Sequence, residues 1–422
     1  MTLFKTSILS LIATAFKMLA GLVINKAVSL YIGPAGLALI GQFQSLSQLI
    51  MIAAQGAINN GVVKYTAEYG PNDSKTPALF STAAKISLIT SIIVGILLIL
   101  LSQTAAKEIL LDIKYQYVFI IFGFTIVLFV LNGLLLSILN GLKEIQTYIK
   151  INIIQSIYAL VLTSILIIAF KLNGALIALA THQSIILLVT LFLLRKHPII
   201  KWENFIKPFN RPIAKKLMGY SAMAITSAIM VPVSHLIIRN YLGTTLGWDQ
   251  AGYWQGIWYI STTYLTIITT TLSVYYLPKL SEINNKKELI REVKQGYQFI
   301  MPIVIIAGFI IWALKDTIIS ILFTKEFLNM RPLFTWQIIG DIFKISSWLL
   351  AYIMLAKSMT KTYIVTEIIF NISFMILSYL FINNFGLIGI TYAYTLNYVS
   401  YMICMIFIFS SIIKELNQKH II

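Results

Sequence analysis

Twelve long apolar runs, separated by short polar breaks, set the pattern of this 422-residue chain. Each run is close to or above the roughly 20 residues that a helix needs to cross a bilayer core of about 30 Å. A helix satisfies its own backbone hydrogen bonds in an apolar solvent, so runs of this length predict membrane-spanning helices. We expect an all-α integral membrane protein with spans at 6–31, 37–63, 79–103, 115–139, 148–170, 174–194, 217–241, 250–276, 296–314, 332–356, 362–382 and 386–413.

Composition agrees with a membrane protein, because 58% of the residues are hydrophobic and only 11% are charged. A net charge of +17 would suggest nucleic-acid binding in a soluble protein, but here the cations lie in short connections between apolar runs. We therefore expect no nucleic-acid partner. There is no Gly-rich phosphate loop, no HExxH, one cysteine and four scattered histidines, so the sequence predicts neither an enzyme nor a cofactor.

The distribution of cations over the connections predicts the orientation. One alternating set of connections carries 21 Lys and Arg residues and the other carries 6. Because cytoplasmic loops are enriched in cations, this bias predicts that both termini and the 196–216 linker are cytoplasmic. Five cations lie inside predicted spans and are not explained by orientation: Lys17, Lys26, Lys85, Arg239 and Lys344.

An internal repeat divides the chain. Sliding the sequence against itself by 215 residues pairs twelve identical residues between Thr147 and Ala178 with partners between Thr362 and Ala393. Two six-span halves of the same orientation follow, with a natural cavity between them. We expect pseudo-symmetric lobes at 1–195 and 217–422 around a central cavity, joined by the linker at 196–216.

Charged residues in mid-span are the candidate functional groups. Asp341 and Lys344 are three apart, about 60° around a helix, and therefore share a face. A charge at the bilayer centre costs at least about 2.5 to 3.5 kcal/mol, so the two residues are either a self-neutralising packing pair or face a water-filled lumen. Lys17 lies midway along its span, Arg239 lies near the outer end of the span at 217–241, and Glu367 lies within the span at 362–382. Lys26 and Lys85 are close enough to span ends to snorkel. The excess of cations in this set favours an anionic ligand such as phosphate.

Several stretches resemble the Wzx-type flippases, which belong to the multidrug/oligosaccharidyl-lipid/polysaccharide exporter superfamily. They are "GPAGL" at 33–37, "NGVVKY" at 60–65, "WDQAGYWQG" at 248–256, "SVYYLPKLS" at 273–281 and "FTWQIIGDIFK" at 334–344. Within that family the chain is most similar to the lipid III flippases of enterobacterial common antigen. Charged positions that match the family pattern are Lys17, Lys26, Lys64, Arg239, Asp341, Lys344 and Glu367, whereas Gln44 stands where a basic residue would be expected.

The resemblance implies a two-lobed transporter of the bacterial inner membrane. It would move an undecaprenyl-pyrophosphate-linked oligosaccharide to the periplasmic leaflet by alternating access, among membrane lipids and beside the polymerase and chain-length machinery of the same pathway. Lys17, Arg239 and Lys344 would hold the pyrophosphate, with Lys26 and Lys64 as further cations and Asp341 and Glu367 as charge partners.

Three amides complete the expected site. Gln42, Asn60 and Gln255 would hydrogen-bond sugars, although such amides also serve as interhelical contacts. The main alternative is an exporter of organic cations from the same superfamily, which should present carboxylates to its lumen. A structural scaffold is disfavoured because it needs no buried charges.

Overall fold

The computed structural model describes residues 3–219, 222–283 and 285–418, and within these ranges the regular elements are helices, with no strand. The predicted all-α fold is confirmed. Two compact units result: unit 1 contains residues 1–32 and 39–232, and unit 2 contains residues 33–38 and 233–422. The lobes predicted at 1–195 and 217–422, the linker at 196–216 and the cavity between the lobes stay predictions.

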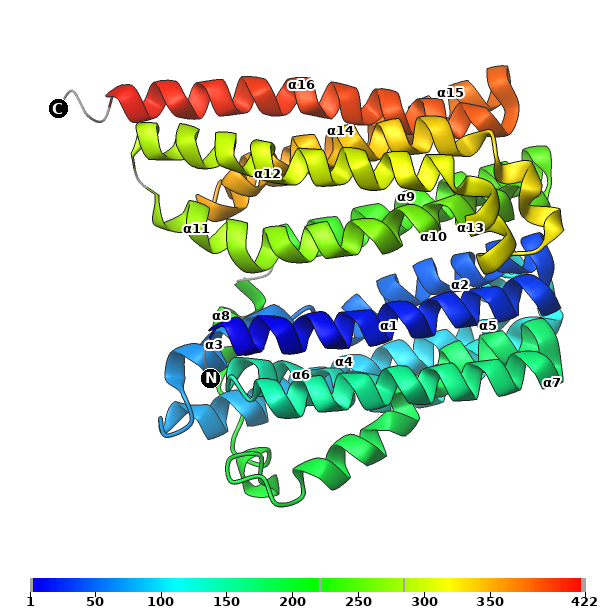
Figure 1. The fold of residues 1–422 in the computed structure, drawn as a ribbon. Coiled ribbons are helices and arrows are strands. Elements are labelled where there is room, and N and C mark those ends of the chain that lie inside the picture. Colours follow the sequence, from blue (N-terminus) through cyan, green and yellow to red (C-terminus); the bar gives the residue numbers. More distant parts are fainter. Residues whose placement is uncertain (1–2, 220–221, 284, 419–422) are drawn as a thin grey trace. The chain divides into compact units, whose positions relative to one another are not determined.

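Unit 1 is a bundle in which α6 is central. Figure 1 shows α1, α4, α6 and α7 running alongside one another, and α6 packs on α3, α4, α5 and α7. Buried rings join α2 to α6, with Phe43 edge-on to Phe119 and Phe122 at centroid distances of 5.7 and 5.9 Å. The elements are α1 (Leu3–Tyr31), α2 (Gly33–Ala54), α3 (Asn59–Tyr69), α4 (Lys75–Leu100), α5 (Ser102–Ile109), η1 (Ile113–Tyr115), α6 (Gln116–Gly141), α7 (Ile145–Leu194), η2 (Trp202–Asn204), α8 (Arg211–Gly219) and the start of α9 (Ala222–Leu246).

Unit 2 is built around α14, which packs on α16, α12, α11, α10 and α15 (Figure 1). Buried aliphatic residues such as Leu349, Ile353 and Met405 fill the space between these helices. The elements after α9 are α10 (Trp248–Thr271), the π-helical turn η3 (Leu272–Tyr276), α11 (Leu277–Glu282), α12 (Lys286–Ala313), α13 (Lys315–Leu322), η4 (Lys325–Met330), α14 (Leu333–Ala356), α15 (Thr360–Phe385), η5 (Gly386–Ile388) and α16 (Gly389–Gln418).

Seven helical stretches of the described residues are long and apolar enough to cross a membrane. Two of them, Ile145–Leu194 with 50 residues and Thr360–Lys414 with 55, are long enough to cross twice. In the described residues the predicted spans fall mainly on helices or on halves of α7, and residues 220–221 of the span at 217–241 lie outside the described residues. The number twelve stays a prediction. The span predicted at 37–63 is wrong in its second part, because α2 ends at Ala54 and positive φ angles at Gly56 and Ala57 turn the chain before α3.

The backbone repeats where the sequence repeats. Lys171 lies at φ 50° and ψ −125° within α7, and Gly386, which is 215 residues later, lies at φ 64° and ψ −145°. Three positions further on, Gly174 and Gly389 each approach a carbonyl eight residues earlier, so that an added Cβ would lie 1.8 Å from Leu166 O and 2.1 Å from Phe381 O, respectively. The kink within α7 and the turn between α15 and α16 therefore have similar backbone geometry.

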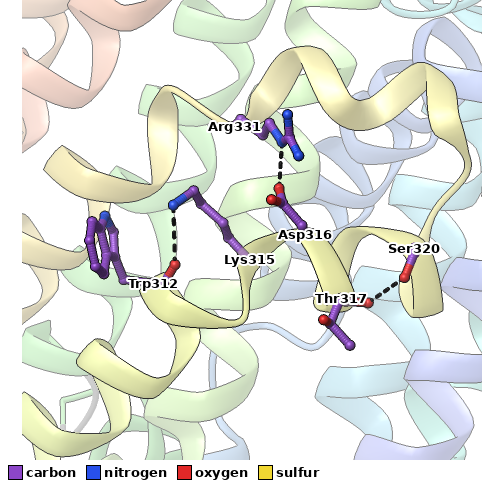
Figure 2. Close-up of polar contacts among 6 residues, drawn as sticks. All are labelled: Trp312, Lys315, Asp316, Thr317, Ser320 and Arg331. Carbon is purple, nitrogen blue, oxygen red and sulfur yellow. Dashed lines mark hydrogen bonds and ion pairs between the residues drawn. The ribbon is translucent and has the colours of Figure 1, made fainter.

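The longest predicted outer connection, between α12 and α14, is itself helical. Arg331 Nε donates a hydrogen bond to Asp316 and thereby joins the end of η4 to the first turn of α13 (Figure 2). Lys315 Nζ lies 3.4 Å from the carbonyl of Trp312, and Ser320 Oγ donates to the carbonyl of Thr317 at 2.8 Å. The Arg331 guanidinium holds the pKa of the exposed Asp316 carboxyl below its ordinary value.

Candidate functional site

Asp341 is the most enclosed charged residue of unit 2, with no exposed surface. It lies in the middle of α14 and accepts hydrogen bonds from three hydroxyl groups on neighbouring helices. Ser261 Oγ lies 2.6 and 2.7 Å from its two oxygens, Tyr264 OH lies 2.8 Å from Oδ2, and Tyr394 OH lies 2.8 Å from Oδ1. Because a buried carboxylate is costly unless its lone pairs are satisfied, this cage explains how Asp341 is kept in the core.

Lys344 follows one turn later on the same face of α14, as predicted, and is only 7% exposed. Its ammonium lies over four rings, at 5.0 Å from Trp258, 5.1 Å from Trp348, 5.5 Å from Tyr398 and 5.9 Å from Tyr394. Each cation–π contact of a desolvated ammonium is favourable by about 0.5 to 2 kcal/mol. The four rings form an aromatic box around the cation.

The two charges of α14 attract each other without a direct contact. The ion pairs of the described residues do not include Asp341 with Lys344 within 4.0 Å. Lys344 nevertheless interacts electrostatically with Asp341 and with Glu367, a half-buried residue of α15. Asp341 therefore accepts hydrogen bonds from hydroxyl groups, whereas the Lys344 ammonium makes cation–π contacts with rings.

Arg239, on α9, is the second buried cation of unit 2 and is 1% exposed. Its Nη2 donates to Gln255 Oε1 at 2.6 Å, and its guanidinium lies 5.6 Å from the ring of Trp254. His235, one turn earlier, packs edge-on to Trp258 at 4.2 Å. The predicted residues Arg239, Gln255, Asp341, Lys344 and Glu367 thus come from four helices of one unit.

The buried and half-buried charges of this cluster, Arg239, Lys344, Asp341 and Glu367, balance one another. Among the described buried and half-buried residues named above, two cations face two acids. The expected surplus of cations depended on Lys17, Lys26 and Lys85, which belong to unit 1; Lys17 is exposed, and the other two are half-buried.

Unit 1 contains a cavity of about 780 Å³ that includes Lys17 of α1. Amide side chains dominate its polar lining, and three of them lie along α2 and its C-terminal end at intervals that keep them on one face. The polar lining residues are Lys17, Gln44, Ser47, Gln48, Gln55, His182, Gln183 and Ser227. Gln44, noted in the sequence as a departure from a basic residue, is one of them.

Four predicted residues lie away from this cavity lining. Gln42 is buried in α2, and Lys26 is half-buried in α1. Asn60 and Lys64 are exposed on α3, where the Lys64 ammonium lies 5.0 Å from the ring of Tyr65. The structure does not bring these four into the cluster of unit 2, and their roles stay predictions.

The hydroxyl cage and the aromatic box were not predicted from the sequence. A signal existed for part of the box: Tyr394 and Tyr398 on α16 are four apart and therefore share a helix face. Aromatic residues at that spacing are also common in ordinary membrane helices, so the spacing alone would not have identified the box.

Comparisons with known proteins show which proteins this chain is similar to. Residues 236–421 match the family model described as "Lipid II flippase MurJ". The lipid III flippases of Escherichia coli (strain K12) and Shigella flexneri are each 28% identical over 411 residues, which cover 97% of this chain and 99% of theirs. Both halves of the chain therefore have counterparts in these relatives.

Solved structures share the fold at low identity. An inward-facing multidrug resistance MATE family transporter of the MOP superfamily aligns with a TM-score of 0.80 and 15% identity, covering 95% of this chain and 96% of that one. A MOP superfamily transporter from Pyrococcus furiosus aligns with a TM-score of 0.73 and 15% identity over 98% and 96%. The chain is a multi-pass membrane transporter with the fold of this superfamily. The match to the flippase family model and the similarity to the lipid III flippases support the flippase type that the sequence motifs predicted.

Proposed function

We propose that this flippase moves an undecaprenyl-pyrophosphate-linked oligosaccharide, such as lipid III or an O-antigen unit, from the cytoplasmic to the periplasmic leaflet by alternating access. The observation that carries the proposal is the environment of the Lys344 ammonium. Its ammonium is held by four ring faces, while the nearest acid is satisfied by hydroxyls. The ammonium can therefore offer its N–H groups to an anion.

Arg239 and Lys344 are the cations that we assign to the pyrophosphate in unit 2. A guanidinium presents a planar fork that suits phosphate oxygens, and an ammonium acts as a point charge. Asp341 and Glu367 then balance the charges of Arg239 and Lys344 when the anion is absent. This assignment predicts that binding needs both cations and that Asp341 acts through Lys344.

The cavity of unit 1 suits the saccharide. Amide groups both donate and accept hydrogen bonds, as sugar hydroxyls do, and four glutamines line this cavity together with Lys17. A volume of about 780 Å³ lies within the usual range for ligand sites. The polyprenyl tail stays in the lipid.

We further propose that the chain lies in the cytoplasmic membrane with both termini cytoplasmic, on the basis of the cation bias of 21 to 6. The polymerase and chain-length machinery that use the same lipid-linked units are the expected neighbours in the pathway. A cysteine placed at Asn204 should resist an impermeant thiol reagent in intact cells; efficient labelling would contradict this orientation.

Complementation tests the substrate. Strains that each lack one lipid-linked glycan flippase are transformed with this gene, and the accumulated intermediate is identified by mass spectrometry. Rescue of at least one strain is expected. If no strain is rescued while resistance to cationic dyes rises, the chain is an exporter of organic cations.

The same assay tests Lys344. Lys344→Ala removes one charge-assisted contact worth about 1.5 to 3 kcal/mol, so transport should fall roughly 10- to 100-fold. Lys361→Ala, which removes an exposed cation near the start of α15, is the matched control and should transport normally. Equal transport by both variants, at equal protein levels, would exclude Lys344 from the anion site.

A further inference from the structure

The linker between α7 and α9 has two different faces. From Arg195 to Lys216 it carries seven cations and a single acid, Glu203. Its inner face packs on unit 1: Phe205 stacks on Phe80 of α4 at 5.8 Å, and Ile213 and Leu217 of α8 are buried in the same cluster. The linker is therefore a docked part of the fold.

Hydrogen bonds fix the linker at one level of α4. Ser81 Oγ and Lys85 Nζ both donate to the carbonyl of Lys207, the latter at 2.6 Å, and the backbone N–H of Asn210 donates to Thr82 Oγ1 at 3.1 Å. The three partners occupy about one turn of the helix. The linker therefore lies at the same position along the axis of α4 as Lys85.

That level corresponds to the edge of the hydrocarbon core. After Lys85, the stretch 86–101 contains no charged residue. The helical part of this stretch, 86–100, has 15 residues and spans about 22 Å, which is most of the roughly 30 Å of a hydrocarbon core. Lys85 therefore marks the boundary between lipid tails and headgroups, and the linker lies beside the headgroups.

The outer face of the linker exposes large apolar side chains at this depth. Trp202 is 79% exposed, Ile206 is 60% exposed and Phe209 is 47% exposed. Exposed cations are interleaved with them, so that the linker patch comprises Lys201, Trp202, Ile206, Lys207, Phe209 and Arg211. Tryptophan is enriched at the membrane interface, and cations beside apolar side chains match anionic headgroups above acyl chains.

We propose that the linker patch inserts into the membrane interface and binds anionic phospholipid of the leaflet on that side. Trp202, Ile206 and Phe209 enter the region between headgroups and tails, and Lys201, Lys207 and Arg211 contact headgroup phosphates. The bound leaflet then holds the segment between α7 and α9 at a fixed depth. This proposal concerns the membrane and does not depend on the transported substrate.

Fluorescence quenching tests the proposal on the whole protein in vesicles. Trp202 is one of seven tryptophans, so its emission is obtained as the difference between the unaltered protein and Trp202→Phe. Vesicles contain the same small fraction of either brominated phosphatidylglycerol or brominated phosphatidylcholine. We expect both lipids to quench Trp202, and the anionic one to quench at a clearly lower fraction, since each cation changes association with an anionic surface roughly fivefold.

Variants that remove cations distinguish specific binding of the anionic lipid from insertion into any lipid. Lys201→Gln/Lys207→Gln/Arg211→Gln should abolish the preference for the anionic lipid, whereas Lys287→Gln/Arg291→Gln/Lys294→Gln, which removes three exposed cations of α12, should keep it. Equal quenching by both lipids in the unaltered protein would overturn anionic recognition. Trp202 emission that is quenched by aqueous iodide and by neither lipid would overturn insertion. Elution as a single folded species checks that the variants are intact.

Discussion

Replacing Lys171 by glycine should stabilise unit 1. The backbone at Lys171 lies at φ 50° and ψ −125°, a region that residues with a Cβ rarely adopt. Such a conformation costs about 1 to 3 kcal/mol, and the greater freedom of glycine in the unfolded chain returns about 0.5 to 1 kcal/mol of this. The net gain expected for Lys171→Gly is therefore about 1 kcal/mol.

Gly386 provides the matched opposite change, because it occupies the equivalent position of the repeat with φ 64°. A Cβ added there would meet no atom within 4 Å, so Gly386→Ala changes backbone strain without a clash. It should destabilise unit 2 by about 1 to 2 kcal/mol. The two substitutions therefore test one conformation in both directions.

Reporters for each unit exist at matched sites. Ala178 and Ala393 are fully buried repeat partners, so a cysteine at either one, in a Cys404→Ser background, reacts with a thiol dye only when its own unit opens. By the scaling found for soluble domains, 1 kcal/mol shifts a melting midpoint by about 2 to 4 °C. A lower midpoint for Lys171→Gly, or an unchanged one for Gly386→Ala, would refute the assignment of strain to this turn.

Two further predictions concern charged contacts. Asp341→Ala should destabilise unit 2 by about 3 to 5 kcal/mol, because it leaves the buried Lys344 ammonium without the acid of its own helix. Adding Lys344→Met should restore much of that loss in the same thermal assay. No recovery would mean that the two residues contribute independently. The pKa of Asp316 is lowered from 3.8, mainly by its hydrogen bond with Arg331. This contact therefore stabilises the α13–η4 connection fully above pH 3.8, and the stabilisation is lost as the pH falls through the lower pKa of the folded state. The protection of residues 315–331 against hydrogen exchange, corrected for the intrinsic pH dependence of exchange, should therefore fall between about pH 5 and pH 2 in the unaltered protein and change less in Asp316→Asn. Identical profiles would contradict the contact.

The sequence predicts the spans and the buried pair because both depend on local signals. Apolar runs of membrane length identify helices, and a spacing of three places Asp341 and Lys344 on one face. The partners of Asp341 leave no such signal. Ser261, Tyr264 and Tyr394 are separated from it by 80, 77 and 53 residues, and only the packing of α10 and α16 on α14 brings their hydroxyls to one carboxylate.

Backbone turns inside apolar stretches are the second feature that composition hides. The run at 37–63 contains no charged residue through residues 55–57, yet the chain turns there with positive φ at Gly56 and Ala57. At Lys171 no glycine marks the turn at all, although its repeat partner is Gly386. Comparing the two halves at an offset of 215 would have located the turn, because the second half keeps the residue type that this conformation favours.

The geometry around Lys344 bears on the choice between a packing pair and a working pair. A pair that only packs would gain most from a direct contact, since the attraction between opposite charges rises steeply at short range in a medium of low dielectric constant. Here Asp341 accepts hydrogen bonds from three hydroxyls, and the N–H groups of the Lys344 ammonium have ring faces as neighbours, which are weaker acceptors than phosphate oxygens. An arriving anion can therefore accept those N–H groups without breaking an ion pair. The carboxylate stays solvated by its cage throughout, so the unit can gain and release a phosphate without leaving a buried charge unsatisfied.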